Sequence, residues 1–176
     1  MKKLWKSSRR ETRHAYPRIL IHEGVLPQTV RVLQLSRDER SAHEGIVYWA
    51  GKMSPSAWII TTSVAPRAET TWGSFTTSAV SNAEVITFLA QHGLELLAQV
   101  HSHPGSRVAH SEGDDEGAFM PYENYLSIVV PNFATRGMLP LTSCGVHRFN
   151  EGRFKRLTRK DVVNLLHIIP AHQGFE

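Results

Sequence analysis

The 176-residue chain has little sulfur chemistry and no long apolar segment. Cys144 is its only cysteine, so an internal disulfide and a cysteine-based zinc cluster are both excluded. We expect Cys144 to be a small buried residue rather than a nucleophile. No apolar run approaches the roughly 20 residues of a membrane-spanning helix, and the N-terminus lacks the apolar core of a signal peptide. We therefore expect a cytoplasmic protein without membrane contact.

Positive charge is concentrated at the N-terminus. The chain has a net charge of +4, yet residues 1–18 alone hold seven basic residues and one acid. A basic tail at residues 1–16 could contact nucleic acid or an acidic partner. We favour a flexible, solvated leader instead and do not expect nucleic-acid binding. Residues 17–176 are long enough for one sizeable core and are predicted to form a single domain.

The order of the expected elements predicts a mixed β-sheet flanked by helices, an α/β sandwich of the α+β type. Apolar runs predict strands at residues 18–21, 45–51, 57–64, 94–100, 125–130, 144–149 and 153–157. Helices are predicted after Leu26, after a capping box at Ser81–Glu84, from a cap at Ser111 on through 115–120, and from Thr158 to Pro170. Residues 66–76 are expected to form a loop.

Two histidines directly follow the predicted strand at 94–100. Side chains two positions apart on a strand share a face, so His101 and His103 project together while Ser102 points away. A third ligand would complete a catalytic zinc site, which keeps its fourth position for water. Asp114 is the natural third ligand, because Ser111 can cap a helix whose first turn holds Asp114.

Taken singly, these features are weak. A lone His-x-His is common, and Ser-x-x-Asp is more often only a helix cap. Together they form a longer pattern of His-x-His, seven residues, Ser, two residues and Asp, with Pro104 directly after the second histidine. This pattern resembles the JAMM motif of the JAB/MPN zinc metalloproteases.

The family also requires an upstream glutamate beside the zinc. Glu44 meets this requirement, since it precedes the strand-like run at 45–51. Glu23 has a similar local sequence but lacks the following strand, so we prefer Glu44. Asp115 is a rival to Asp114 as third ligand, and the family spacing favours Asp114. The resemblance covers roughly residues 17–157 and implies the JAB/MPN fold, which is similar to the cytidine-deaminase-like arrangement.

The resemblance implies one zinc ion per chain with a catalytic water, held by His101, His103 and Asp114. Glu44 would act as general base and then general acid, and Ser111 would donate a hydrogen bond to the oxyanion. The implied reaction is hydrolysis of the bond at the C-terminus of ubiquitin or a ubiquitin-like protein. The compact chain is similar to prokaryotic JAB proteins associated with ubiquitin-like conjugation and antiphage defence operons, so conjugation-pathway enzymes are further expected partners.

Other interpretations stay open at this point. Trp72 either lines a substrate channel or packs beneath its loop, and is a candidate substrate-binding residue. We expect His110 and His147 to be loop or surface residues. A non-catalytic MPN scaffold, a RadC-like DNA-associated protein of the same superfamily, and an enzyme that processes sulfur-carrier proteins are alternative functions.

Overall fold

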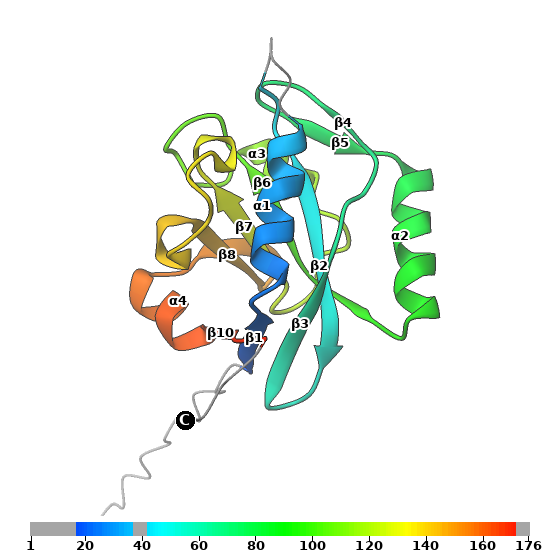
Figure 1. Ribbon diagram of the computed structural model, residues 1–176, viewed down its shortest axis with the longest axis vertical. Coiled ribbons are helices and arrows are strands. Elements are labelled where there is room, and N and C mark those ends of the chain that lie inside the picture. Colours follow the sequence, from blue (N-terminus) through cyan, green and yellow to red (C-terminus); the bar gives the residue numbers. More distant parts are fainter. Residues whose placement is uncertain (1–16, 37–41, 172–176) are drawn as a thin grey trace, which may run out of the picture.

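An eight-stranded mixed sheet forms the centre of the molecule (Figure 1). The computed structural model describes residues 17–36 and 42–171, so the predicted basic tail lies outside the described residues. The strands follow the order β10-β1-β3-β2-β6-β7-β8-β9. Their bounds are β1 Arg18–His22, β2 Ile46–Met53, β3 Ala57–Val64, β6 Glu95–Ser102, β7 Leu126–Val130, β8 Gly145–Asn150, β9 Arg153–Arg156 and β10 Leu166–Ile169.

Helices cover both faces of this sheet. Helices α1 (Val25–Leu35) and α4 (Arg159–Leu165) share one apolar core, and α2 (Ala79–Gln91) packs on the other. Strand β2 contributes to both cores by alternation: Val47 and Trp49 join the α1 side, whereas Ile46, Tyr48 and Ala50 join the α2 side. The predicted α/β sandwich is therefore confirmed.

The centre of the sheet holds the histidine-bearing strand. β6 pairs antiparallel with β2 and parallel with β7, so its backbone is bonded on both sides. Ala98 and Val100 face the α1 core, and the intervening Gln99 and the following His101 point to the opposite face. The predicted strand thus delivers the histidines to the α2 side of the sheet.

Local sequence signals misplaced the limits of three elements. Helix α2 begins at Ala79 with Ser78 as its cap, three residues before the predicted capping box, because the Ser78 hydroxyl accepts the hydrogen bond of the Ser81 amide. Helix α3 spans Glu112–Glu116 and stops at Gly117, so the predicted continuation of this helix through residue 120 is wrong. The predicted loop at 66–76 contains a hairpin of β4 (Ala68–Thr70) and β5 (Phe75–Thr77).

The last predicted helix is also too long. It begins after Thr158 as expected, but it ends at Leu165, and Leu166–Ile169 form strand β10 beside β1. The apolar run fits either structure, and parallel pairing with an otherwise open edge of β1 favours the strand. None of the helices in the described part of the chain has the length and apolar character needed to cross a membrane.

Cys144 is buried, as expected, and its Sγ lies 3.4 Å from the Met138 carbonyl oxygen. Burial raises the pKa of this thiol to about 11, so the reactive thiolate form is disfavoured near neutral pH. This behaviour supports a packing role for Cys144 rather than a nucleophilic one.

Candidate metal centre

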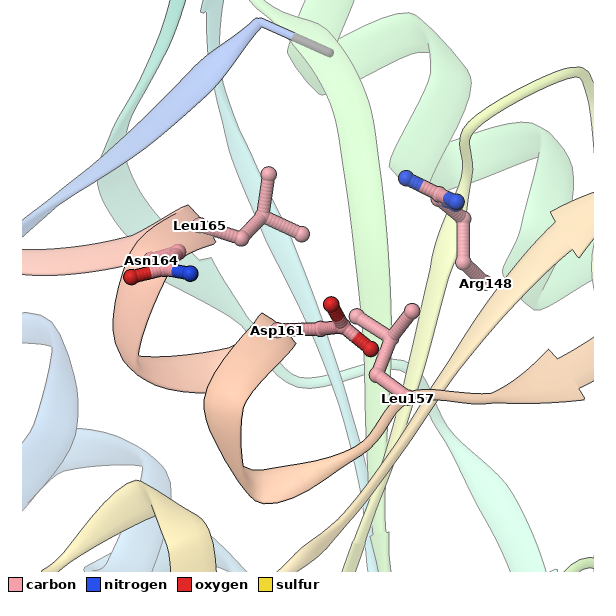
Figure 2. A pocket seen from close by; sticks show the side chains of 5 residues that line it. All are labelled: Arg148, Leu157, Asp161, Asn164 and Leu165. Atoms are coloured by element: carbon pink, nitrogen blue, oxygen red, sulfur yellow. The ribbon is translucent and has the colours of Figure 1, made fainter. Parts of the chain in front are cut away.

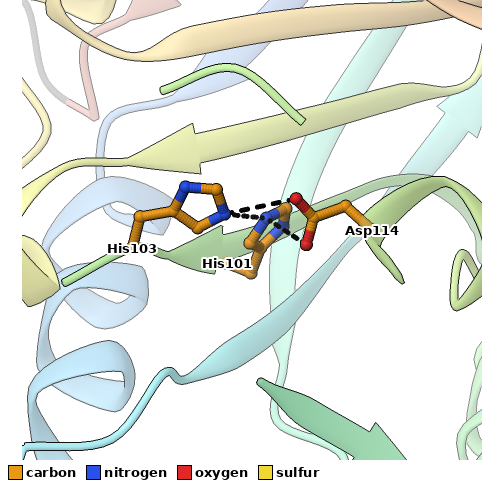
Figure 3. A group of neighbouring side chains, drawn as sticks. All are labelled: His101, His103 and Asp114. Atoms are coloured by element: carbon orange, nitrogen blue, oxygen red, sulfur yellow. Dashed lines mark hydrogen bonds and ion pairs between the residues drawn. The ribbon is translucent and has the colours of Figure 1, made fainter. Parts of the chain in front are cut away.

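The two motif histidines converge at the end of β6 (Figure 3). The Nε2 atoms of His101 and His103 lie 3.2 Å apart, and both side chains are buried. His103 lies just beyond β6, where its amide donates to the Val130 carbonyl oxygen and its own carbonyl accepts from the Phe133 amide. Backbone bonds thus fix both residues in place.

Asp114 reaches the histidines from the first turn of α3. The Ser111 hydroxyl accepts from the Asp114 amide at 3.2 Å, and Asp114 Oδ2 accepts from the Ser111 amide at 2.6 Å. This reciprocal capping box confirms the predicted cap. Asp114 Oδ1 then lies 3.2 Å from His101 Nε2, and its Oδ2 lies 3.3 Å from His103 Nε2.

These three residues can converge on one metal ion. Ligand atoms about 2.0–2.1 Å from a tetrahedral zinc lie roughly 3.3–3.4 Å from one another, and the two Nε2 atoms are 3.2 Å apart. The histidines face different oxygens of the Asp114 carboxylate, and one ligand atom from each of the three residues lies within 4.8 Å of the others. The donor set of two imidazoles and one carboxylate also suits zinc. The His-His-Asp group is therefore compatible with a metal ion held by three protein ligands.

The two histidines differ in their protonation preference. Burial lowers the pKa of His101 despite the nearby Asp114, so the neutral imidazole is favoured. Burial also opposes charge on His103, but the hydrogen bond and charge of Asp114 raise its pKa overall. His103 Nδ1 lies 3.1 Å from the Arg107 carbonyl oxygen. With its hydrogen on Nδ1, His103 would donate to that carbonyl, and the lone pair of Nε2 would face the cluster and be free to bind a metal.

Glu44 lies just before β2, beside this group. Its amide donates to the Thr71 carbonyl oxygen at 2.8 Å. Burial raises the pKa of its carboxyl to about 7, and the charges of His103 and Asp114 act on it in opposite directions. Glu44 is thus within electrostatic reach of the cluster. Glu23, the alternative, accepts from the Ala171 amide near the end of β10.

Ser102 has a structural role that the sequence did not reveal. Its hydroxyl accepts from the Gly45 amide at 3.0 Å, and its amide donates to the Gly45 carbonyl oxygen at 3.1 Å. These two bonds tie the segment of Glu44 to the strand of the histidines. Gly45 also lies against α1, where an added Cβ would come 3.0 Å from the Leu33 Cα.

A groove of about 560 Å³ opens beside Asp114 and Ser111. One wall is β5 with Phe75, and the other is α3 with Gly113 and Gly117. Strand β5 pairs with β4 and with no further strand in residues 17–36 and 42–171. The groove therefore has a sheet edge on one side and small residues on the other.

The prediction of a loop or surface position is wrong for His147, which is buried on β8. His110 does lie in a loop, as predicted, but its side chain is only 6% exposed. Their rings stack with centroids 3.9 Å apart. The sequence could not reveal this, because it does not show which positions of β8 lie opposite β7. Asp115, the rival third ligand, bonds to His110 instead.

Trp72 lies in the turn between β4 and β5 and is 67% exposed. It therefore does not pack beneath its loop, and its role in substrate binding stays a prediction. A separate hollow of about 290 Å³ lies between the end of β9 and α4 (Figure 2). Its lining residues are all distinct from the His-His-Asp group: Arg148, Leu157, Asp161, Asn164 and Leu165.

Fold and site together define an α/β protein with a buried His-His-Asp group at the end of a central strand. A family model described as prokaryotic homologues of the JAB domain matches residues 36–140, more than half of the chain. The chain belongs to this family. The matched segment contains all five predicted motif residues, Glu44 through Asp114.

The chain is also similar to individual proteins. The chain is 37% identical over 99 residues to "Probable metalloprotease y4jG" of Sinorhizobium fredii, a match covering 54% of this chain and 60% of that protein. The match thus spans about three-fifths of the relative's length. The solution structure of protein DSY2949 from Desulfitobacterium hafniense shares the fold, with a TM-score of 0.64, 11% identity and coverage of 88% and 94%. AF2198, a JAB1/MPN domain protein from Archaeoglobus fulgidus, matches at a TM-score of 0.48 with 13% identity, over 88% and 99% of the two chains.

Proposed function

We propose that this protein is a zinc-dependent peptidase or isopeptidase that cleaves the bond after the C-terminus of a ubiquitin-like protein. The observation that carries the proposal is the convergence of His101, His103 and Asp114 at the end of β6, next to Glu44, whose carboxyl pKa is raised. The same bond chemistry serves deconjugation and precursor processing. A bacterial ubiquitin-like conjugation or antiphage system is the proposed setting, with conjugation enzymes as partners.

Zinc held by these three residues would supply Lewis acidity, which lowers the pKa of water toward about 7 and polarises a carbonyl. Glu44 accepts a proton from the attacking water as the new C–O bond forms. It then returns this proton to the amine nitrogen as the C–N bond breaks. A carboxyl pKa of about 7 suits a group that takes and returns a proton near neutral pH.

Ser111 has a second task in this proposal. Its hydroxyl oxygen accepts the Asp114 amide, which leaves the hydroxyl hydrogen available as a donor. Ser111 is exposed in the groove wall, so this hydrogen can meet the oxyanion of the tetrahedral intermediate. One such donor typically contributes about 3–4 kcal/mol to catalysis.

The groove supports an extended peptide as substrate. A tail laid along β5 would complete the unpaired edge of that strand through backbone hydrogen bonds. Gly113 and Gly117 on the opposite wall leave room for backbone rather than bulky side chains. Such an arrangement favours a slender C-terminal tail over a folded segment, and Trp72 at the hairpin turn would contact its upstream part.

The test combines metal content with cleavage. Wild-type protein is expected to bind about one zinc per chain and to release a reporter joined by a peptide bond to the C-terminus of a ubiquitin-like protein. We expect Glu44→Gln to keep its zinc and to lose about 10²- to 10⁴-fold in activity, because the proton acceptor is removed. Glu23→Gln is the matched control and is expected to keep both zinc and activity.

The outcomes separate the alternatives. A wild-type protein that takes up no zinc at neutral pH contradicts the metalloprotease proposal and favours the non-catalytic scaffold. Zinc binding without cleavage of any peptide-bonded or isopeptide-bonded ubiquitin-like fusion contradicts the substrate class. An unchanged rate in Glu44→Gln would remove Glu44 from its proposed role.

A further inference from the structure

We propose that His110 is a positioning residue, which ties the turn of Ser111 and Asp114 to the central sheet and thereby sets the metal affinity of the site. This inference rests on the proposed function, because it concerns a metal held by Asp114 and the two ligand histidines. It assigns a role to a residue that lies outside the five-residue motif.

The His110 ring bridges two elements. Its Nδ1 lies 2.6 Å from Asp115 Oδ1 on α3, and its Nε2 lies 2.8 Å from Ser127 Oγ on β7. Ser127 is fully buried in the sheet. The imidazole therefore connects the helix that carries Asp114 to a strand directly beside the histidine-bearing β6.

The direction of each hydrogen bond follows from the chemistry of the partners. The Asp115 carboxylate can only accept, so His110 Nδ1 must carry the hydrogen. In the neutral ring Nε2 is then an acceptor, and the Ser127 hydroxyl donates to it. Gln99 Nε2 in turn donates to Ser127 Oγ at 3.1 Å, and the Phe119 amide donates to Gln99 Oε1. All of these hydrogen bonds are consistent with one tautomer of His110, in which Nδ1 carries the hydrogen.

The order of Asp115, His110 and Ser127 is also that of a nucleophilic triad. Ser127 is 0% exposed and pairs with Gln99 on the neighbouring strand, so no substrate carbonyl can reach its oxygen. The arrangement therefore suits a structural brace rather than a second catalytic centre.

Neighbouring side chains restrict the movement of the His110 ring. His147 stacks on one face of the His110 ring, and the Phe154 ring meets it edge-on with centroids 4.9 Å apart. The loop that leads to His110 presses on β8 at Gly145, where an added Cβ would lie 1.8 Å from the Val108 carbonyl oxygen. Three successive strands, β7, β8 and β9, thus contact the ring.

The ligand turn has few other ties to the sheet. Among the described residues, the remaining hydrogen bonds of 111–116 stay within 111–117, apart from those between Asp114 and the two histidines. When a metal ion replaces the contacts of Asp114 with the two histidines, the hydrogen bond between Asp115 and His110 is the one that still links residues 111–116 to the sheet. Loss of this link is expected to leave Asp114 less well placed before the metal arrives.

The experiment measures zinc affinity by competition with a chromophoric chelator. We expect His110→Ala and Asp115→Ala each to raise the zinc Kd by about 10-fold, as for other groups that orient metal ligands. The double variant should lose no more than His110→Ala alone, because both changes break one chain. Glu112→Ala removes an exposed charge from the same short helix and should change the Kd by less than about threefold, because solvent screens it.

Two further measurements distinguish a positioning role of His110 from a loss of folding. The absorption spectrum of the cobalt-substituted protein should change in His110→Ala and Asp115→Ala but not in Glu112→Ala, and the metal-free variants should stay folded by circular dichroism. Asp115 is half-exposed, so Asp115→Ala decides the matter if His110→Ala does not fold.

Wild-type Kd values in both folded single variants would overturn the proposal. So would a double variant weakened by the product of the two single effects, or a Glu112→Ala variant as weak as Asp115→Ala, since either points to charge alone. A wild-type protein without zinc affinity would instead refute the proposed function, and the two failures are thereby distinguishable.

Discussion

In the described part of the chain, α3 and α4 begin with the same kind of capping box, but the two boxes have different outcomes. In α3 the pair is Ser111 and Asp114, and in α4 it is Thr158 and Asp161. In both, the hydroxyl accepts from the aspartate amide at 3.2 Å and the carboxylate accepts from the cap amide. The local backbone geometry therefore does not distinguish them.

What differs is the surroundings of each carboxylate. Asp114 is 6% exposed and faces two imidazole nitrogens, whereas Asp161 is exposed and its Oδ2 accepts the hydroxyl of its own cap. Burial opposes ionisation of Asp114, yet hydrogen bonds from His101 and His103 lower its pKa. A capping box thus becomes a candidate metal ligand only where the fold brings histidines to it.

The largest expected difference is in metal content. Asp114→Ala should reduce bound zinc from about one per chain to near zero and abolish activity, because two imidazoles alone hold the ion weakly. Asp161→Ala should keep both, since no imidazole faces it in the described structure. Zinc per chain, measured by elemental analysis of both purified variants, checks this. Equal zinc loss in the two would mean that the capping box itself, rather than its surroundings, matters.

Replacing the hydroxyl residue of each capping box should also affect activity in α3 and not in α4, but the difference should be smaller than for the aspartates. Ser111→Ala removes a cap and the proposed oxyanion donor, and should lower the cleavage rate about 10²- to 10³-fold at saturating substrate. Thr158→Ala removes only a cap, at about 1 kcal/mol of stability, and should leave the rate unchanged. Steady-state kinetics and denaturant unfolding of both variants make the comparison. A rate loss in Thr158→Ala as large as that in Ser111→Ala would refute a catalytic role for the hydroxyl.

The smallest expected effect is in the response of the metal-free protein to acid. Burial lowers the pKa of His147, behind the α3 turn, to about 3, while an unfolded histidine titrates near 6.5. Below about pH 6.5 the unfolded chain binds a proton that the folded chain does not, so stability falls as the pH falls. Between pH 7 and 5 this group contributes a loss of at most about 2 kcal/mol.

His147→Phe removes this titrating group and should reduce the pH dependence accordingly. Urea unfolding at pH 7 and 5, with chelator present, measures the difference between the variant and the wild type. Identical pH dependence in the two proteins would show that His147 is protonated in the folded state as easily as in the unfolded one.

Much of the candidate site could be predicted from the sequence, because its signal is local. His101 and His103 lie two positions apart on an apolar strand, and Ser111 and Asp114 have the spacing of a cap. Glu44 needed the family resemblance to be preferred over Glu23. The apolar runs at 45–51 and 57–64 likewise predicted strands β2 and β3.

The errors arose where distant residues decide the structure. Leu166–Ile169 form a strand because β1 offers a partner, which their own sequence does not indicate. The sequence suggests a loop or surface position for His147, but this residue pairs with Ser127 inside the sheet, and its ring stacks on that of the loop residue His110. The β4–β5 hairpin is short and largely polar, so it lacks the apolar alternation that identifies a strand.

The single buried thiol has a practical consequence for following this protein in solution. Because the pKa of Cys144 is raised and its sulfur is buried, maleimide and iodoacetamide should not modify this thiol in the native protein. A cysteine introduced in place of Trp72 would be the only other thiol in the chain. A fluorophore attached there would lie at the turn where the upstream part of the tail is proposed to pass, and its emission would report the arrival of a peptide in the groove.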